Sequence, residues 1–221
     1  LFLFGDRIPI RITFKGYDWQ VMKRVLQIGM TPFVIISLDS VLIISLNATI
    51  QKLGGPGQGD TLLTCATIVQ SFMLMVTMPL GGITSGTQTI LGYNYGAKRP
   101  DRIWRAEKCI VSLGLIFTTV MFLAAQLVPE FFVRIFTRNE EYIRLTVWAI
   151  RVFTLGVIPL AVQYTIVDGF TGMGISHVAI SLSLWRKAVF LAGVFLIPRF
   201  GGVTSVFYTE PVSDFVGTLV S

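Results

Sequence analysis

Apolar runs about as long as a membrane-spanning helix alternate with short polar segments along most of this chain. The hydrocarbon core of a bilayer is about 30 Å thick, so a helix needs about 20 apolar residues to cross it. Only helices and closed barrels can span lipid, and these runs lack the period-two alternation of barrel strands. The pattern predicts an all-α integral membrane protein with six transmembrane helices at approximately residues 25–50, 62–90, 109–128, 145–170, 178–197 and 203–221.

The polar segments are too short to form a separate domain. We expect a leader at residues 1–24, followed by one six-helix bundle at residues 25–221. Composition supports a protein surrounded by lipid, because 53% of the 221 residues are hydrophobic, only 14% are charged, and the mean hydropathy is +0.72. Soluble domains usually have about 25% charged residues. The lipid bilayer is therefore the first expected partner.

Basic residues are concentrated at one end of the predicted bundle. Five lie in the leader and five in the segment Leu91–Lys108, whereas five are spread over the opposite side. Cytoplasmic segments of membrane proteins carry an excess of Lys and Arg. We therefore expect a multi-pass protein whose leader, Leu91–Lys108 loop and C-terminus are cytoplasmic. The formal net charge of +6 does not indicate nucleic-acid binding, because the charge is confined to the loops.

Motifs of enzymes and of metal sites are absent from the sequence. It contains no nucleophile elbow, zincin motif, phosphate-binding lysine loop or dinucleotide fingerprint. The cysteines Cys65 and Cys109 lie in or beside apolar runs, and the single His177 has no partners at metal-site spacing. We expect neither an enzyme nor a bound cofactor or metal.

Acidic residues inside the apolar runs are the candidates for binding a coupling cation or a proton. Asp39 falls near the middle of the first run, and Asp168 falls late in the fourth, where a solvated helix end is the favoured alternative. Glu210 and Asp214 share one face of the sixth run, because side chains four positions apart are neighbours on a helix. A charge at membrane depth is costly, so it normally faces a cavity or a partner.

Other polar or flexible residues inside the runs could line a cavity or let helices bend. Of the adjacent Arg186 and Lys187, we expect one to pair with an acid and the other to extend toward the interface. The candidates for cavity or substrate contact are Asn47, Gln70, Met73, Gln163, Tyr164 and Arg186. The candidate hinges are Pro32, Pro79, Gly82, Pro159 and Pro211, since proline and glycine interrupt regular helices. A bundle that bends around a polar interior is typical of channels and transporters.

Three stretches carry a family resemblance. They are GTQTILGYNYGAKRPDRIWRAEK, FFVRIFTRNEEYIRLTVWAIRVF and GMGISHVAISLSLWRKAVFLAGVFLIPRFGGVTSVFYTEPVSDF. Together they resemble the C-terminal half of a MATE (multidrug and toxic compound extrusion) transporter of the prokaryotic multidrug efflux group. The resemblance covers essentially the whole chain. The sequence begins without an initiator Met and stops within an apolar run, so we expect a piece of a longer protein. The resemblance to half of a transporter agrees with this expectation.

The resemblance implies a function that composition alone could not. MATE transporters have twelve helices in two six-helix lobes around a central cavity, and they export organic cations in exchange for Na⁺ or H⁺. This chain would be the second lobe, its partner the missing N-terminal lobe, and its location the bacterial inner membrane. Asp39 lies near the place of an acidic cation ligand found in some members. Some members have a second acid in the middle of the fourth helix, where this chain has Gln163 and Tyr164 instead. Asp168 lies too close to the Gly172–Gly174 turn to match that acid.

Two other functions remain open. A flippase for lipid-linked oligosaccharides belongs to the same superfamily, and anionic headgroups would favour unpaired basic residues such as Arg151 and Arg186. From a different class, the chain could be a membrane scaffold or a fragment that transports nothing. Buried acids and kinked helices argue against a scaffold, because an anchor needs neither.

Overall fold

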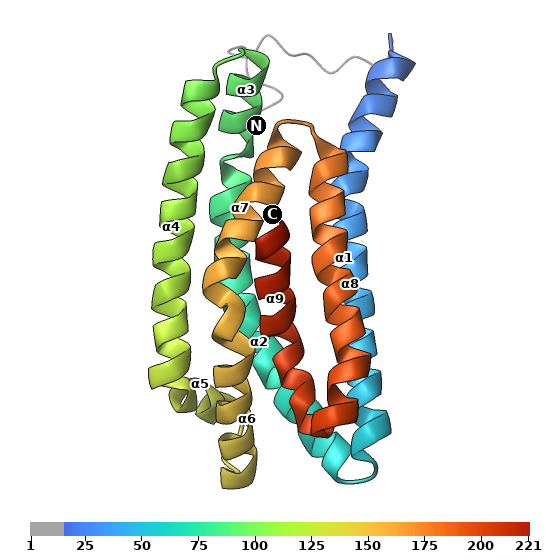
Figure 1. The fold of residues 1–221 in the computed structure, drawn as a ribbon, viewed down its shortest axis with the longest axis vertical. Helices are drawn as coiled ribbons and strands as arrows, with labels where there is room; N and C mark the ends of the chain where they lie inside the picture. Colours follow the sequence, from blue (N-terminus) through green and yellow to red (C-terminus); the bar gives the residue numbers. More distant parts are fainter. Residues whose placement is uncertain (1–15) are drawn as a thin grey trace.

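Helices account for nearly all of residues 16–221, the part of the chain that the computed structural model describes (Figure 1). The first fifteen positions of the predicted leader, including three of its basic residues, lie outside this part. The leader's last residues are helical, because Asp18 caps the first helix by accepting a hydrogen bond of 2.8 Å from the Gln20 backbone N–H. The helices are α1 (Trp19–Gly54), α2 (Gln58–Gly86), α3 (Gln88–Gly96), α4 (Pro100–Leu127), α5 (Pro129–Phe136), α6 (Glu140–Phe153), α7 (Val157–Gly172), α8 (Ser176–Gly201) and α9 (Thr209–Val220), with short 3₁₀ turns η2 (Thr154–Gly156) and η3 (Val203–Tyr208).

Five stretches of the described chain are long and apolar enough to cross a membrane. They are Trp19–Gly54, Gln58–Gly96, Pro100–Leu127, Glu140–Gly172 and Ser176–Gly201. Each contains or overlaps one of the first five predicted runs, so the all-α membrane architecture is confirmed. The sixth predicted helix, at 203–221, differs: its first residues form η3, and α9 has only 12 residues. Helix α9 still lies inside the bundle, against α7 and α8 (Figure 1).

The fourth predicted helix is interrupted. The sequence predicted one helix at approximately 145–170 with a candidate hinge at Pro159, whereas α6 ends at Phe153 and α7 begins at Val157, with η2 between them. Pro159 explains the break, because proline has no N–H to donate to the carbonyl four residues earlier. In the first turn of α7 that missing donor costs nothing. Pro211 occupies the same kind of position in α9, whereas Pro32 and Pro79 lie inside the continuous helices α1 and α2.

The hydrophobic core fills the half of the bundle near the α1–α2 turn. Its fully buried side chains include Leu46, Ile50, Leu62, Ile150 and Phe207. These come from the second half of α1, the first half of α2, α6 and η3. The opposite half, near α3, contains a cavity.

A close approach between α3 and α7 shapes that second half. A Cβ atom added at Gly172 would lie 2.8 Å from Gln88 Cα, so only glycine lets the two backbones meet here. A Cβ at Gly92 would likewise lie 2.5 Å from the Gly172 carbonyl oxygen. This contact places Gln88 beside the last turn of α7, which carries Asp168.

Candidate functional site

A cavity of about 280 Å³ lies between α1, α7 and α8, with α3 contributing at one end. On α1 its lining residues recur every three or four positions, from Pro32 to Asp39, as one face of a helix requires. The same spacing holds for α7 and α8, so three helices each present one stripe to a shared space. The lining residues are Pro32, Ile35, Ile36, Asp39, Gln88, Gln163, Tyr164, Val167, Asp168, Thr171, Ser183, Arg186 and Lys187.

Asp39 is paired with a lysine in the cavity wall. Lys187 Nζ donates a hydrogen bond to Asp39 Oδ1 across 148 positions of sequence. The Lys187 side chain is only 5% exposed, whereas that of Asp39 is 47% exposed. Helices α1 and α8 pack side by side, which brings the two residues together (Figure 1). Sequence reasoning placed Asp39 among the coupling candidates but left Lys187 out.

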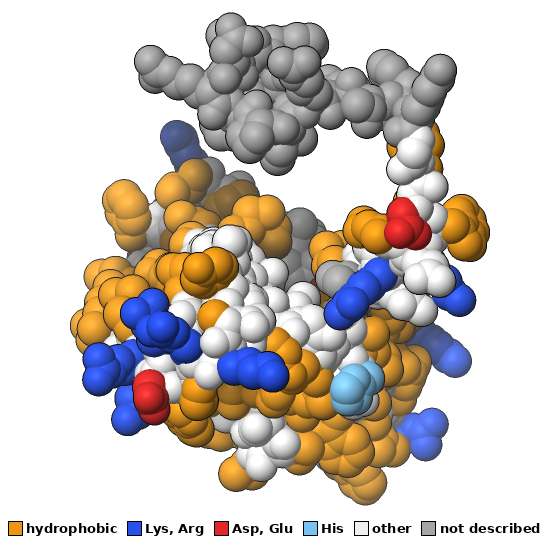
Figure 2. All heavy atoms as spheres, turned by 90° about the horizontal axis from the view of Figure 1, so that it is seen from above, with side chains coloured by type: hydrophobic (Ala, Val, Ile, Leu, Met, Phe, Trp, Pro, Cys, Tyr) orange, Lys and Arg blue, Asp and Glu red, His pale blue; other side chains and the backbone are white. Residues whose placement is uncertain are grey.

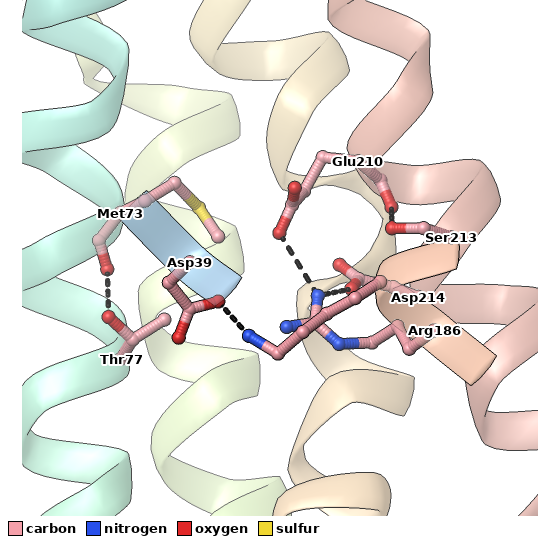
Figure 3. A network of polar contacts seen from close by, with 8 residues as sticks. Asp39, Met73, Thr77, Arg186, Glu210, Ser213 and Asp214 are labelled. Atoms are coloured by element: carbon pink, nitrogen blue, oxygen red, sulfur yellow. Dashed lines mark hydrogen bonds and ion pairs between the residues drawn. The ribbon is translucent and has the colours of Figure 1, made fainter. Parts of the chain in front are cut away.

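Arg186 binds both acids of the last helix. Its Nη1 atom lies 3.1 Å from Asp214 Oδ1 and 3.4 Å from Glu210 Oε1 (Figure 3). Asp214 is completely buried, and its second oxygen has no hydrogen-bond partner among the described residues. Arg186 also lines the cavity, whereas the two acids lie behind it. The expectation that only one of Arg186 and Lys187 would pair with an acid is therefore wrong.

Asp168 is held by neutral donors instead of a basic residue. Thr84 Oγ1 donates to one of its oxygens, and Gln88 Nε2 donates to the other at 3.1 Å. The carboxylate is half-buried and lines the cavity, which differs from the expected solvated helix end. Glu107 of α4 lies close by, in a space that exists because Gly169 has no Cβ. The sequence offered no signal for Glu107, since it lies among the loop charges.

Gln163 is a buried polar side chain without a partner. It is 2% exposed, and neither its amide oxygen nor its amide nitrogen has a hydrogen-bond partner among residues 16–221. Its neighbour Tyr164 lines the same cavity. Buried polar groups are usually hydrogen-bonded, so an unpaired amide at a cavity wall is a site where a ligand or water can bind.

The remaining candidates lie elsewhere in the bundle. Asn47 and Gln70 each have one buried side-chain atom without a partner in the described part of the chain, and Met73 belongs to the hydrophobic core. Figure 3 shows Met73 on α2, where its carbonyl oxygen accepts a hydrogen bond of 3.0 Å from Thr77 Oγ1. Of the candidate hinges, Pro32 lines the cavity, and Pro79, Gly82, Pro159 and Pro211 do not.

The end of the bundle nearest the cavity is basic. Figure 2 shows Lys and Arg side chains spread around this end, with few acidic ones among them. Lys98 and Arg99, between α3 and α4, and Arg102 and Arg105, in the first turns of α4, are exposed there. Within residues 16–221, no three His, Cys, Asp or Glu side chains are placed to hold a metal ion.

Comparison with known proteins identifies the family. The sequence model of the MatE family matches residues 36–192. A MATE crystal structure in complex with MaL6 superimposes with a TM-score of 0.87 at 15% identity, covering 96% of this chain and 48% of that one. An outward-facing multidrug resistance MATE transporter of the MOP superfamily gives the same values. No curated protein matches the chain.

A third solved structure shares the fold. It is a MOP superfamily transporter from Pyrococcus furiosus whose binding pocket is described as having reverse polarity, with a TM-score of 0.86 and 15% identity, covering 96% of this chain and 48% of that one. This chain thus spans about half the length of the solved chains that it matches. The family model covers more than half of the chain, and the fold agrees over nearly all of it. The chain belongs to the MatE family, and its multi-pass helical fold matches about half of each of these solved chains.

Proposed function

We propose that this lobe forms half of a secondary antiporter that exports small organic cations in exchange for Na⁺ or H⁺. The observation that carries the proposal is a cavity with a carboxylate on each of two walls, Asp39 on α1 and Asp168 on α7. Between them, Ile35, Ile36 and Val167 supply apolar surface. An organic cation needs both features, because its body is apolar and its charge requires a counter-ion.

The charges around the cavity favour a cation. Both basic side chains that line it are already bound to carboxylates, Lys187 to Asp39 and Arg186 to the two acids of α9. Among residues 16–221, no Lys or Arg forms an ion pair with Asp168. A partly desolvated site with excess negative charge attracts cations.

The coupling mechanism would use the same residues. A proton or cation arriving at Asp39 changes the charge of α1 about two turns after Pro32, where the helix can bend. Transporters built from two related halves alternate access by rocking one half against the other around a central site. In this scheme the cavity belongs to the face that meets the other lobe, and the protein lies in the bacterial inner membrane with no cofactor and no enzymatic step.

The test is ethidium efflux by the full-length protein carrying Asp39→Asn. We expect ion-driven efflux to be lost in this variant and largely kept in Asp39→Glu, which retains the carboxylate. Asp60→Asn is the matched control, because Asp60 is an exposed acid in the first turn of α2, away from the cavity. Unchanged efflux by Asp39→Asn would contradict the assigned role.

The alternative is a flippase for lipid-linked oligosaccharides. Its support is that Arg186 and Lys187 both reach the cavity, where an anionic headgroup could replace their carboxylate partners. Transfer of a fluorescent pyrophosphate-linked lipid across liposomes, without any ethidium transport, would favour this function. Absence of both activities in the full-length protein would favour a non-transporting scaffold.

A further inference from the structure

Lys187 and Asp39 form an ion pair in which the two partners differ in environment. The Lys187 side chain is almost fully buried, whereas about half of the Asp39 side chain is exposed, and both residues line the cavity. A cation that enters the cavity can therefore reach Asp39 without first reaching Lys187. The position that it would take next to the carboxylate is already held by the lysine ammonium, a tethered cation.

Among the described residues, Asp39 is the acid with which Lys187 forms an ion pair, and the other acids near the cavity are held by other partners. From α7, Asp168 lines the same cavity but is bound by Thr84 and Gln88. From α9, both acids are bound by Arg186. The ionisable groups that face Lys187 from the packed helices are Asp39 on α1, Tyr164 and Asp168 on α7, Arg186 on α8, and Glu210 and Asp214 on α9.

An ammonium at this depth without a carboxylate is costly, and its neighbour Arg186 carries the same charge. Burial without a partner favours the neutral form of an amine. Releasing one proton relieves both the desolvation cost and the repulsion. Arginine could not respond in this way, because its guanidinium stays protonated in proteins.

We propose that an organic cation displaces Lys187 from Asp39 and that Lys187 then releases its proton. The step is balanced: the Asp39 carboxylate exchanges one cation for another, Lys187 changes from ammonium to amine, and one H⁺ leaves. The net charge of the site is unchanged. Return of a proton to Lys187 restores the ion pair and expels the organic cation. The inference rests on the proposed function, and it names the proton as the coupling ion and Lys187 as its carrier.

The experiment measures proton release when tetraphenylphosphonium binds to the full-length protein in weakly buffered detergent at neutral pH. A pH-sensitive dye reports released protons, and equilibrium dialysis reports bound cation. For the unmodified protein we expect about one proton per bound cation. Lys187→Met removes the tethered cation, so we expect affinity to rise about tenfold or more with no proton released at this site.

Lys187→Arg keeps the ion pair but cannot release a proton. We expect it to bind tetraphenylphosphonium about tenfold more weakly than the unmodified protein and to release none. Lys52→Met is the control, because Lys52 is an exposed lysine in the last turn of α1. It should leave both readings unchanged.

Full proton release by Lys187→Met, together with lost binding in Asp39→Asn, would overturn this inference while leaving the proposed function intact. Unchanged affinity in Asp39→Asn would instead contradict the proposed function and this inference with it. The Lys187→Met protein should fold, because half of the Asp39 side chain remains accessible. The arginine variant guards against misfolding by retaining a partner for Asp39.

Discussion

Arg186 reaches across from α8 to α9 and lies 3.1 Å from Asp214, a carboxylate with no exposed surface. Glu210, one turn earlier on α9, contacts the same guanidinium atom at 3.4 Å. One arginine thus bridges two acids that lie on one helix face, and its single positive charge weakens the repulsion between them. The sequence predicted that the two acids share one helix face, and the structure identifies the basic residue that binds both.

Removing this arginine should destabilise the protein strongly. Breaking a buried ion pair by deleting one partner typically costs about 3–5 kcal/mol, because the other charge stays buried and unpaired. We expect Arg186→Met to lower the thermal unfolding midpoint of the full-length protein in detergent well below that of Asp214→Asn. The milder effect follows because Asp214→Asn leaves Arg186 paired with Glu210.

A surface arginine is the control for that comparison. Arg134 pairs with Glu130 and Glu140, but its side chain is 49% exposed. Exposed pairs contribute little to stability. Arg134→Met should leave the unfolding midpoint nearly unchanged, and equal losses at positions 134 and 186 would contradict the account of the buried pair.

The turn η2 must end in glycine for Asp214 to fit. A Cβ atom at Gly156 would lie 2.6 Å from Asp214 Cβ and 2.9 Å from Pro211 Cα. Overpacking of this kind costs about 1–3 kcal/mol. We therefore expect Gly156→Ala to lower the unfolding midpoint.

Gly82 provides the matched substitution, because a Cβ there meets nothing within 4 Å. Gly82→Ala should keep or slightly raise stability, since alanine is the better helix former. If α2 bends near Pro79 and Gly82 during transport, the same substitution should slow ethidium efflux. Equal loss of stability in Gly82→Ala and Gly156→Ala would refute the steric argument.

Gln163 should separate stability from binding. Its amide is buried and unpaired in the described chain, and such a group costs about 1–3 kcal/mol. Gln163→Leu should therefore raise the unfolding midpoint. It should also weaken tetraphenylphosphonium binding about tenfold, because a tenfold change in affinity corresponds to the loss of one good hydrogen bond or bridging water. A variant with higher stability and unchanged affinity would show that Gln163 does not contact the ligand.

Hydrophobic length predicted most of the fold, because it is a local property of the chain. The interruption at η2 was harder to predict from the sequence, because Thr154–Gly156 lies within an apolar run and Pro159 is the only nearby residue that indicates a break. The resemblance to MATE transporters is confirmed by the MatE family match. The acids could be found because ionisable residues are rare inside apolar runs.

Their partners could not be found in the same way. Lys187 is 148 positions from Asp39, and Thr84 is 84 positions from Asp168. Which helices lie side by side decides these pairs, and a single sequence does not state that. Gln88 and Glu107 illustrate the same limit, because each is ordinary in its own segment and becomes distinctive only against α7.

The orientation in the membrane is testable by labelling. The basic end of the bundle should be cytoplasmic, because Lys and Arg are enriched in cytoplasmic loops. A single cysteine placed at Lys98 in a cysteine-free background should react with an impermeant maleimide only after cells are permeabilised. A cysteine at Arg138, on the opposite side, should react in intact cells, and the reverse pattern would invert the proposed topology.

The central claim is that ions drive organic cations through this protein by way of Asp39. The most direct measurement is ethidium transport in liposomes that contain the purified full-length protein, with an imposed H⁺ or Na⁺ gradient. The account predicts that ethidium moves against its own gradient when an ion gradient is present, and that Asp39→Asn abolishes this movement. Transport that persists without any ion gradient, or that Asp39→Asn leaves unchanged, would contradict the account.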